Sequence, residues 1–449
     1  MLAFLDSFFT IKNKDDLGQK LFYIGFLFLP SALPITIICF LGALYISYKF
    51  NKIIFLHDIF DVLLLLSLLL IILGTIYTTY FNLPKELLPE DIFDIWISLF
   101  NWVPLFFIYW GFQSYLNSIT KRLLTIKFLV AGTIPVLVSC IIQYFFNIYG
   151  PFKFFFNSII WFNKPLSSTG GVTGLFSNPN YTGLFLTLTL PFLYFLNIHK
   201  KNSFKSKIIL LFLTFLTLYF SIYTNSRNAL IGILISLLMI INIKKIFYYF
   251  IFFTSGLYMS INLISNNLKD TSLYFKNLLD ICAKNLSLSS FCKIFSNDIG
   301  IISPRTMIWI STISAIKDRP LFGWGGSTFF KVLPYKNIFT NDYSSTKFFH
   351  SHNIILEIAF CFGIPVALFL SISLISLLIS AFNRLKFDNN LKNRFFNKAW
   401  LYSFLIILVS HLFDVTLYDA KISLIFVILL SGVRCIIEND NLLIIKTTN

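Results

Sequence analysis

Long apolar stretches recur along the whole chain and alternate with short polar segments. A helix of about 20 apolar residues crosses the roughly 30 Å hydrocarbon core of a bilayer and satisfies its own backbone hydrogen bonds. The apolar positions are continuous rather than alternating, which excludes a barrel. The pattern predicts spans near 21–48, 61–80, 95–113, 127–147, 180–198, 208–224, 228–243, 246–264, 353–381, 399–417 and 421–437.

The number of spans depends on the first of these stretches. It contains Pro30 and Pro34, so it forms either one kinked helix or two short helices. The first reading gives eleven spans and the second gives twelve, with both termini on one side. No internal repeat or linker divides the chain, so we predict an all-α polytopic membrane protein in which residues 1–449 form a single integral membrane domain.

Composition supports this class of protein. Hydrophobic residues make up 57% of the chain, charged residues make up 12%, and the mean hydropathy is +0.77. A net charge of +16 in a soluble protein would suggest binding to nucleic acid. Here the basic residues cluster in short loops between apolar stretches, so the charge reports topology and membrane lipid is the expected surrounding, with no nucleic acid partner.

The basic residues all fall in alternate loops between the predicted spans, so these loops lie on one side of the membrane, which is predicted to be cytoplasmic. They contain Lys49, Lys52, Lys121, Arg122, Lys200, Lys201, Lys205, Lys207, Lys244, Lys245, Arg384, Lys386, Lys392, Arg394 and Lys398. The segments 81–94, 148–179, 225–227, 265–352 and 418–420 then face outward. The longest of them, 265–352, is the predicted outer loop.

Two features of this outer loop are testable against a structure. Cys282 and Cys292 would form a disulfide if the loop faces an oxidising compartment. Residues 305–317 have apolar positions at helical spacing, which predicts an amphipathic helix lying on the membrane.

Four polar stretches fall on the predicted outer side, each beside a span. In the first, 168–183, glycines precede Asn178, Pro179 and Asn180 at the start of a helix, whose free amides suit an anion; an ordinary turn and helix cap explain the same residues. In the second, Arg227 lies at the tip of a hairpin, where it requires an anionic partner or reaches lipid headgroups.

The third stretch, 303–329, supplies Arg305 and, after a helix, Arg319 in a turn that contains Trp324 and several glycines. Glycines beside a tryptophan allow close approach of a ligand whose sugar rings stack on the indole, and a plain loop turn explains them equally well.

The fourth stretch places His350 and His352 just before a span. Histidines two residues apart do not share a helical face and no third ligand is evident nearby, so we expect no metal site. A neutral imidazole would instead take a proton from a hydroxyl group, oriented by Asn353 or Glu357. The alternative is a pair of interfacial histidines solvated by headgroups and water.

A second pair of titratable residues, His411 and Asp414, lies three residues apart at the outer end of the next span. The two side chains either join the same cavity or pair with each other.

Taken together, the sequences "GLFSNPN", "TNSRNAL", "SPRTMIW" followed by "RPLFGWGGSTF", and "HSHNIILEIAFCFGIP" resemble the ordered motifs of the O-antigen ligase and O-antigen polymerase superfamily. The motifs cover roughly residues 165–380. The resemblance implies a twelve-helix, GT-C-like fold in a bacterial inner membrane, with a long periplasmic loop and an active site on the periplasmic side.

The resemblance also implies roles for individual residues. His352, followed by Asn353 and later by Gly363, matches the proposed catalytic base, and Arg227 and Arg305 match the arginines that hold the donor diphosphate. His350, Asn353, Arg319, Asn180 and Glu357 are candidate supporting residues. The chain departs from the family pattern at Val366, where relatives usually have glycine, and at Gly171, where many have arginine.

The implied reaction is metal-independent, cofactor-free, inverting glycosyl transfer from an undecaprenyl-diphosphate-linked glycan donor. The acceptor would be lipid A-core, a second lipid-linked glycan or a protein hydroxyl.

A transporter of an anion such as bicarbonate, or of a lipid-linked sugar, is the alternative from another class. A transporter requires charged or broken-helix elements near the bilayer midplane, whereas the predicted spans have few central charges and the polar groups gather at one surface. A structural scaffold is a further alternative.

Overall fold

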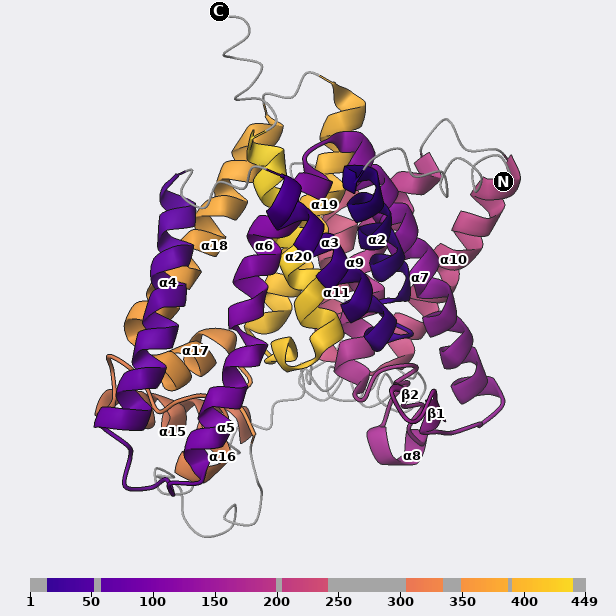
Figure 1. The fold of residues 1–449 in the computed structure, drawn as a ribbon. Helices are drawn as coiled ribbons and strands as arrows, with labels where there is room; N and C mark the ends of the chain where they lie inside the picture. Colours follow the sequence, from indigo (N-terminus) through magenta and orange to yellow (C-terminus); the bar gives the residue numbers. More distant parts are fainter. Residues whose placement is uncertain are drawn as a thin grey trace, which may run out of the picture.

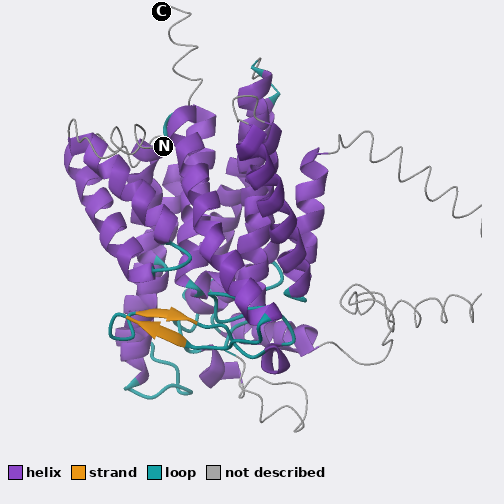
Figure 2. Ribbon diagram, turned by 90° about the vertical axis from the view of Figure 1, so that its right-hand side faces the viewer, coloured by secondary structure: helices purple, strands orange, loops and turns teal. Residues whose placement is uncertain are grey.

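The computed structural model describes residues 14–51, 58–198, 204–240, 304–333, 349–386 and 390–438. The chain folds into a bundle of roughly parallel and antiparallel helices, with short helices and one hairpin gathered at one end (Figures 1 and 2). The predicted span 246–264, and most of the predicted loop 265–352 with Cys282 and Cys292, lie outside the described residues.

Among the described residues, eight helical segments are long and apolar enough to cross a membrane, which confirms a polytopic membrane protein. They are α3 (Leu33–Phe50), α4 (Ile59–Ile76) with a π-helical turn (Tyr77–Phe81), α5 (Asp91–Ser98) with a 3₁₀ turn (Leu99–Asn101) and α6 (Val103–Leu116), α7 (Ile119–Phe145), α9 (Pro179–Ile198), α10 (Phe204–Tyr223), α18 (Ile364–Leu385) and α20 (Ala420–Glu438). Three further helices belong to the bundle: α2 (Lys14–Phe28), α11 (Arg227–Ile240) and α19 (Leu391–His411).

The first predicted span is two helices rather than one kinked helix. α2 ends at Phe28 and α3 begins at Leu33, with Pro30 in the turn between them and Pro34 in the first turn of α3, where its missing N–H costs nothing. The two helices pack antiparallel, and the absence of a side chain at Gly25 leaves room for the ring of Phe40. The second of the two readings of this stretch is therefore confirmed.

Two predicted spans are interrupted at the same end of the bundle. The span predicted at 95–113 breaks after α5, and the span predicted at 353–381 consists of α17 (Ile354–Phe362) and α18, separated by Gly363. Gly363 has a φ of +93°, and a Cβ atom there would overlap the carbonyl oxygen of Leu321. Only glycine fits such a position, so Gly363 determines where the helix breaks.

The glycine-rich turn after Arg319 packs into this break. The backbone N–H groups of Trp324 and Gly325 donate to the carbonyls of Phe360 and Cys361, and that of Ile364 donates to Pro320. The Trp324 side chain is 2% exposed and its indole N–H donates to Ala315. The hypothesis that sugar rings stack on this indole is therefore wrong: the tryptophan belongs to the core and the glycines serve chain packing.

The end of the bundle that carries these breaks also carries all the remaining short elements (Figures 1 and 2). They are β1 (Phe152–Phe154) and β2 (Ile159–Trp161), paired antiparallel with Phe152 opposite Trp161, and α8 (Leu166–Thr169), α15 (Pro304–Asp318), α16 (Phe329–Val332) and a 3₁₀ turn (Thr416–Tyr418). The described parts of the four polar stretches singled out in the sequence therefore lie at one end, which we call the outer end.

The helix predicted at 305–317 is present as α15, but its apolar side chains lie on several faces of the helix rather than on one. Ile308 and Ala315 are buried, where α15 contacts α17, whereas Ile310 and Ile313 are exposed. The helix is thus partly embedded in the protein rather than a simple amphipathic helix resting on a surface.

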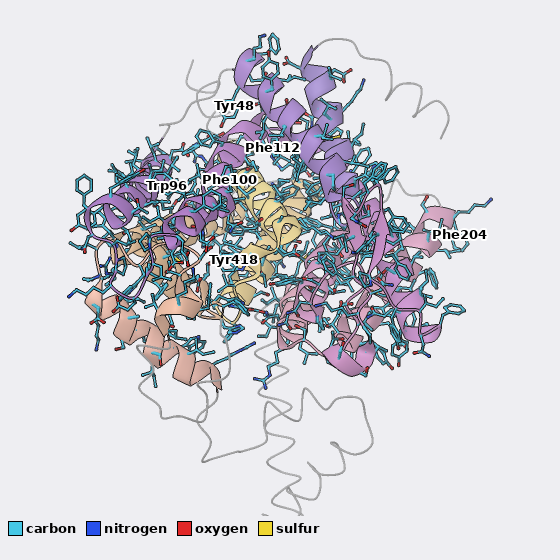
Figure 3. All side chains as sticks on the ribbon, turned by 60° about the horizontal axis from the view of Figure 1, so that its bottom comes forward. Tyr48, Trp96, Phe100, Phe112, Phe204 and Tyr418 are labelled. Carbon is cyan, nitrogen blue, oxygen red and sulfur yellow. The ribbon has the colours of Figure 1, made fainter. Side chains whose placement is uncertain are left out.

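The core of the bundle is centred on α9 and α20, whose spans are 78% and 83% buried. Figure 3 illustrates the contrast between interior and periphery: Phe112 lies among the packed helices, whereas Phe204 projects from the edge. Exposed apolar side chains at the periphery are expected where helices face lipid.

Candidate functional site

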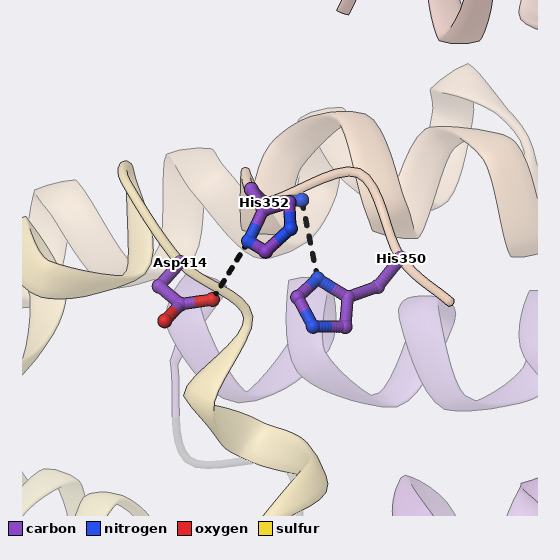
Figure 4. A group of neighbouring side chains, drawn as sticks. All are labelled: His350, His352 and Asp414. Carbon is purple, nitrogen blue, oxygen red and sulfur yellow. Dashed lines mark hydrogen bonds and ion pairs between the residues drawn. The ribbon is translucent and has the colours of Figure 1, made fainter. Parts of the chain in front are cut away.

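Three side chains from two distant segments meet at the outer end of the bundle. His350 and His352 lie in the loop before α17, and Asp414 lies in the turn after α19 (Figure 4). The Nδ1 atom of His352 is 3.1 Å from Oδ1 of Asp414, and the backbone N–H of His352 donates to Nδ1 of His350 at 3.3 Å. The two histidines that are close in sequence are thus joined to a carboxylate 62 residues away.

The loop that carries the histidines is held at several points. Asn353 caps α17 by accepting from the N–H groups of Ile355 and Leu356, and its side-chain amide donates to the carbonyl of Leu412 at 3.0 Å. The latter bond ties the histidine loop to the end of α19. Asn353 is therefore a structural link between the two segments, not the group that orients the imidazole.

The same loop is anchored from below by a buried carboxylate. Glu357, 1% exposed, accepts from the backbone N–H of Ser351 at 2.8 Å and from the hydroxyl of Tyr418 at 2.6 Å. The indole N–H of Trp309 donates to the carbonyl of Ser351 at 2.9 Å. These contacts fix His352 in a left-handed backbone conformation, with a φ of +55°, which a residue other than glycine adopts only where its surroundings determine it.

Asp414 is almost fully buried yet well supplied with donors. It is 3% exposed and accepts from the backbone N–H of Val415 at 3.0 Å, from the side-chain amide of Asn180 at 2.9 Å, and from His352. Burial alone would raise the pKa of Asp414, but the hydrogen bond from His352 and the nearby positive charges, including Arg305, hold this pKa below its ordinary value. The carboxylate is therefore ionised at neutral pH.

The contact with Asp414 fixes the chemistry of His352. A carboxylate only accepts hydrogen bonds, so Nδ1 of His352 carries a proton, and in the neutral ring Nε2 keeps its lone pair. Nε2 has no hydrogen-bond partner within the described parts of the chain, and the side chain is 28% exposed. A base oriented by a buried carboxylate and open to an incoming hydroxyl group is the arrangement that general base catalysis requires.

His350 supports this arrangement as a neutral group. Burial is the main cause that lowers the pKa of His350 to about 4; the neighbouring His352 imidazole and Arg305 lower it further, and Asp414 opposes the shift. The neutral ring accepts the backbone N–H of His352 through Nδ1 and so helps to hold the loop.

Arg227 and Arg305 come close to each other and to this cluster. Arg227 begins α11 and is exposed, and Arg305 lies in the first turn of α15. Burial lowers the pKa of Arg305, the carboxylate of Asp414 opposes that effect, and the charge of Arg227 lowers it further. Neither guanidinium has a hydrogen bond or ion pair with any residue that the structure describes. Two neighbouring cations that form no ion pair with the described residues are a candidate site for an anion.

Two of the predicted supporting residues lie elsewhere or act differently. Arg319 donates to the carbonyl and side-chain oxygens of Asn82 at 2.8 and 3.1 Å and lies over the ring of Trp324, so it secures the turn rather than joining the cluster. Glu357 lies beneath the loop and does not contact an imidazole nitrogen. Asp414 takes the orienting role that the sequence analysis gave to Asn353 or Glu357.

His411 and Asp414, considered together in the sequence, are neighbours whose side chains have different hydrogen-bond partners. Nδ1 of His411 is 2.9 Å from the hydroxyl oxygen of Thr416, and the imidazole is buried, whereas Asp414 contacts His352. The sequence indicated that Asp414 lies at the outer end of a span. It could not indicate that this carboxylate contacts His352.

The premise that no third metal ligand lies near the two histidines is wrong. One ligand atom from each of His350, His352 and Asp414 lies within 4.8 Å of the others. This set matches the donors that zinc uses, but two of the atoms already form the Nδ1 hydrogen bonds described above.

An apolar cavity of about 270 Å³ opens beside the cluster. Helices α4, α6, α17, α18, α19 and α20 line it with aliphatic and aromatic side chains. Ile354 and Ile355, shortly after His352, and Leu412, shortly before Asp414, bring the cavity next to the catalytic candidates.

Gly171, where many relatives of the resembled family have arginine, has no room for a side chain. A Cβ atom at this position would overlap the backbone of Thr224. Glycine replaces the arginine of these relatives because the backbone at Gly171 packs directly against the turn between α10 and α11.

Comparisons with known proteins agree with the motifs. Residues 209–371 match the family model of the O-antigen ligases. The chain is also similar to the ComP-specific O-oligosaccharyltransferase of Acinetobacter baylyi, with 29% identity over 237 residues, which is 50% of this chain and 38% of that protein. The match thus spans well under half the length of this relative. The resemblance expected from the motifs is confirmed, and the protein is a polytopic membrane protein that is similar to the O-antigen ligase family over residues 209–371.

Proposed function

We propose that this protein transfers a glycan from an undecaprenyl-diphosphate-linked donor to an acceptor hydroxyl group at the periplasmic face of the bacterial inner membrane. The observation that carries the proposal is the pairing of His352 with buried Asp414 beside two guanidinium groups that form no hydrogen bond or ion pair with the described residues. His352 with Asp414 suits the role of proton acceptor, and the two arginines suit the binding of a leaving diphosphate.

In the proposed reaction, Nε2 of His352 takes the proton of the acceptor hydroxyl group as its oxygen attacks the anomeric carbon. The bond between that carbon and the phosphate oxygen breaks, and the diphosphate leaves with the electron pair. Asp414 stabilises the imidazolium that forms, and such base catalysis contributes a factor of about 10²–10⁴ in rate. A single displacement of this kind inverts the anomeric configuration.

Arg227 and Arg305 would hold the diphosphate. Each guanidinium donates several hydrogen bonds in a planar fork that matches phosphate oxygens. The negative charge on the diphosphate grows as the glycosidic bond breaks, so the two arginines stabilise the transition state more than the bound donor.

The apolar cavity between α4, α6 and α17–α20 suits the polyprenyl chain of the donor. Its lining is almost entirely hydrocarbon, and it reaches the histidine loop at Ile354 and Ile355. A lipid lying in this cavity would deliver its diphosphate to the outer end of the bundle, where the arginines are. The basic loops predicted to be cytoplasmic support a periplasmic position for that end.

Three classes of acceptor fit the proposed reaction: lipid A-core, a lipid-linked glycan and a protein hydroxyl. The name of the Acinetobacter relative describes a protein-directed enzyme specific for ComP. The three acceptors share a hydroxyl nucleophile, so the same base would serve all of them.

The test is transfer by the purified protein in lipid vesicles. Undecaprenyl-diphosphate-linked glycan would be supplied with each acceptor class in turn, with and without EDTA, and the release of undecaprenyl diphosphate measured. We expect release with one acceptor class, and no effect of EDTA because His352 and Asp414 act as a base rather than as metal ligands. Absence of release with every acceptor would contradict the proposal; loss of release in EDTA, restored by zinc, would contradict the metal-independent mechanism.

A further inference from the structure

A second cavity at the outer end differs in chemistry from the apolar one. It has a volume of about 350 Å³ and lies between α8, the start of α9 and the turn that joins α10 to α11. Every lining residue except Pro179 has a polar side chain; the others are Lys164, Ser168, Thr169, Ser177, Asn178, Asn180, Thr224 and Asn225. Among the described residues no acidic side chain lines it, so the cavity suits neither a hydrocarbon chain nor a cation.

The walls of this polar pocket are fixed by the backbone. The N–H of Val172 donates to the carbonyl of Tyr223 at 3.0 Å, and the side-chain amide of Asn225 donates to the carbonyl of Gly170 at 2.5 Å. Gly171 allows the two segments to approach this closely, since any side chain there would meet Thr224. The pocket is thus preformed, which reduces the entropy cost of binding a ligand.

Several polar groups in the pocket are still available to a ligand. Asn178 uses its amide oxygen to accept from the backbone N–H of Asn180, and Asn180 uses its amide nitrogen to donate to Asp414. Within the described ranges, the amide nitrogen of Asn178, the amide oxygen of Asn180 and the hydroxyl of Ser177 have no hydrogen-bond partner. A mixture of donors and acceptors in a rigid pocket suits the hydroxyl groups of a sugar ring.

The polar pocket adjoins the proposed reacting groups on two sides. Asn180 both lines it and binds Asp414, the partner of His352. Thr224 and Asn225, which also line it, come just before Arg227. A sugar in this pocket would therefore lie next to both the base and the diphosphate site.

We propose that the polar pocket between α8, the start of α9 and the α10–α11 turn is a carbohydrate subsite that binds one sugar ring of the donor glycan or of a glycan acceptor. This inference rests on the proposed function and extends it by naming the residues that contact the glycan. Lys164, the one charged residue in the lining within the described ranges, would donate to hydroxyl groups and favour sugars that carry a negative charge.

The experiment compares variants that fill or weaken the pocket with matched variants outside it. Ser177→Trp fills the pocket and Lys164→Ala removes its charge; Ser158→Trp and Lys153→Ala make the same changes on the β1–β2 hairpin, where both residues are exposed. Binding of three probes would be measured in detergent: glycosylated undecaprenyl diphosphate, glycan-free undecaprenyl diphosphate, and the glycan acceptor.

We expect Ser177→Trp to weaken binding of a glycosylated probe by tenfold or more and Lys164→Ala to weaken it by about threefold, with the hairpin variants unchanged. Binding of glycan-free undecaprenyl diphosphate should stay within twofold. Loss confined to the donor identifies the subsite as the donor's, and loss confined to the acceptor identifies it as the acceptor's.

The inference is overturned if neither glycosylated probe binds more weakly, or if glycan-free undecaprenyl diphosphate is weakened to the same extent. These binding measurements require no turnover. Failure of the wild-type protein to transfer glycan would therefore count against the proposed function, whereas unchanged binding in the Ser177→Trp variant would count against the subsite alone.

Discussion

At the scale of single residues, the central feature is a histidine whose neighbours decide which nitrogen is free. Asp414 accepts from Nδ1 of His352 and leaves Nε2 to face a substrate. The motifs predicted His352 as the base, and the sequence placed Asp414 at the outer end of a span. It could not pair them, because they are 62 residues apart and their separation depends on how α17 and α19 pack.

The role of Asp414 leads to a prediction. Asp414→Asn keeps the size of the side chain but removes the charge that stabilises the imidazolium, and it allows the wrong tautomer of His352. We expect kcat to fall by a factor of about 10²–10⁴ with little change in KM for the donor. Steady-state kinetics in vesicles would check this result; a kcat within threefold of wild type would show that the carboxylate has only a structural role.

A second prediction concerns pH. The pKa of His350 in the folded protein is about 4, below the unfolded value of about 6.5, so the unfolded chain binds more protons between these values. The folded state should therefore lose stability as the pH falls from 6.5 toward 4, and this contribution should be complete above pH 6.5. Thermal unfolding in detergent would show a shallower pH dependence over this window for His350→Gln; an identical slope would mean that His350 is not the group responsible.

At the scale of elements, breaks in helices bring the site together. Gly363 ends α17 and allows the turn at Pro320–Gly325 to pack into the gap, which in turn positions α15 with Arg305 against α17. The sequence predicted one continuous span over 353–381, because hydropathy detects apolar residues and not the direction of the backbone. It correctly predicted the helix at 305–317 but not the burial of Trp324.

The break at Gly363 can be tested by comparison with another glycine. Gly363→Ala would force a Cβ atom against the Leu321 carbonyl in a left-handed conformation and should cost about 1–3 kcal/mol of stability or more. Gly42→Ala, inside α3, meets only the end of the Leu21 side chain and should be tolerated. Thermal unfolding of both purified variants would decide; equal stability would mean that the break does not depend on glycine.

At the scale of the whole molecule, the outer end carries the polar groups and the opposite end carries the predicted cytoplasmic charges. The alternation of apolar stretches and basic loops was sufficient to predict this arrangement, because lipid allows few alternatives to a helical bundle. The ion pairs of buried Arg434 with Asp58 and Asp61 were not predicted, since they depend on how α4 and α20 pack at the opposite end.

The difference between the two ends of the bundle leads to a prediction about two basic residues. Arg227→Ala removes one of the two cations at the proposed diphosphate site and should raise KM for the donor by tenfold or more. Lys205→Ala removes a charge of the same sign at the start of α10, on the predicted cytoplasmic side, and should change nothing. Donor titrations in vesicles would compare the two variants, and equal effects would contradict the topology.

The most direct measurement of the account as a whole is the single-turnover rate of glycan transfer by His352→Gln at saturating donor, together with donor binding by the same variant. If His352 is the base in a site that the arginines share, the rate falls by about 10²-fold or more while donor binding stays within twofold of wild type. A transfer rate close to that of wild type would contradict the account.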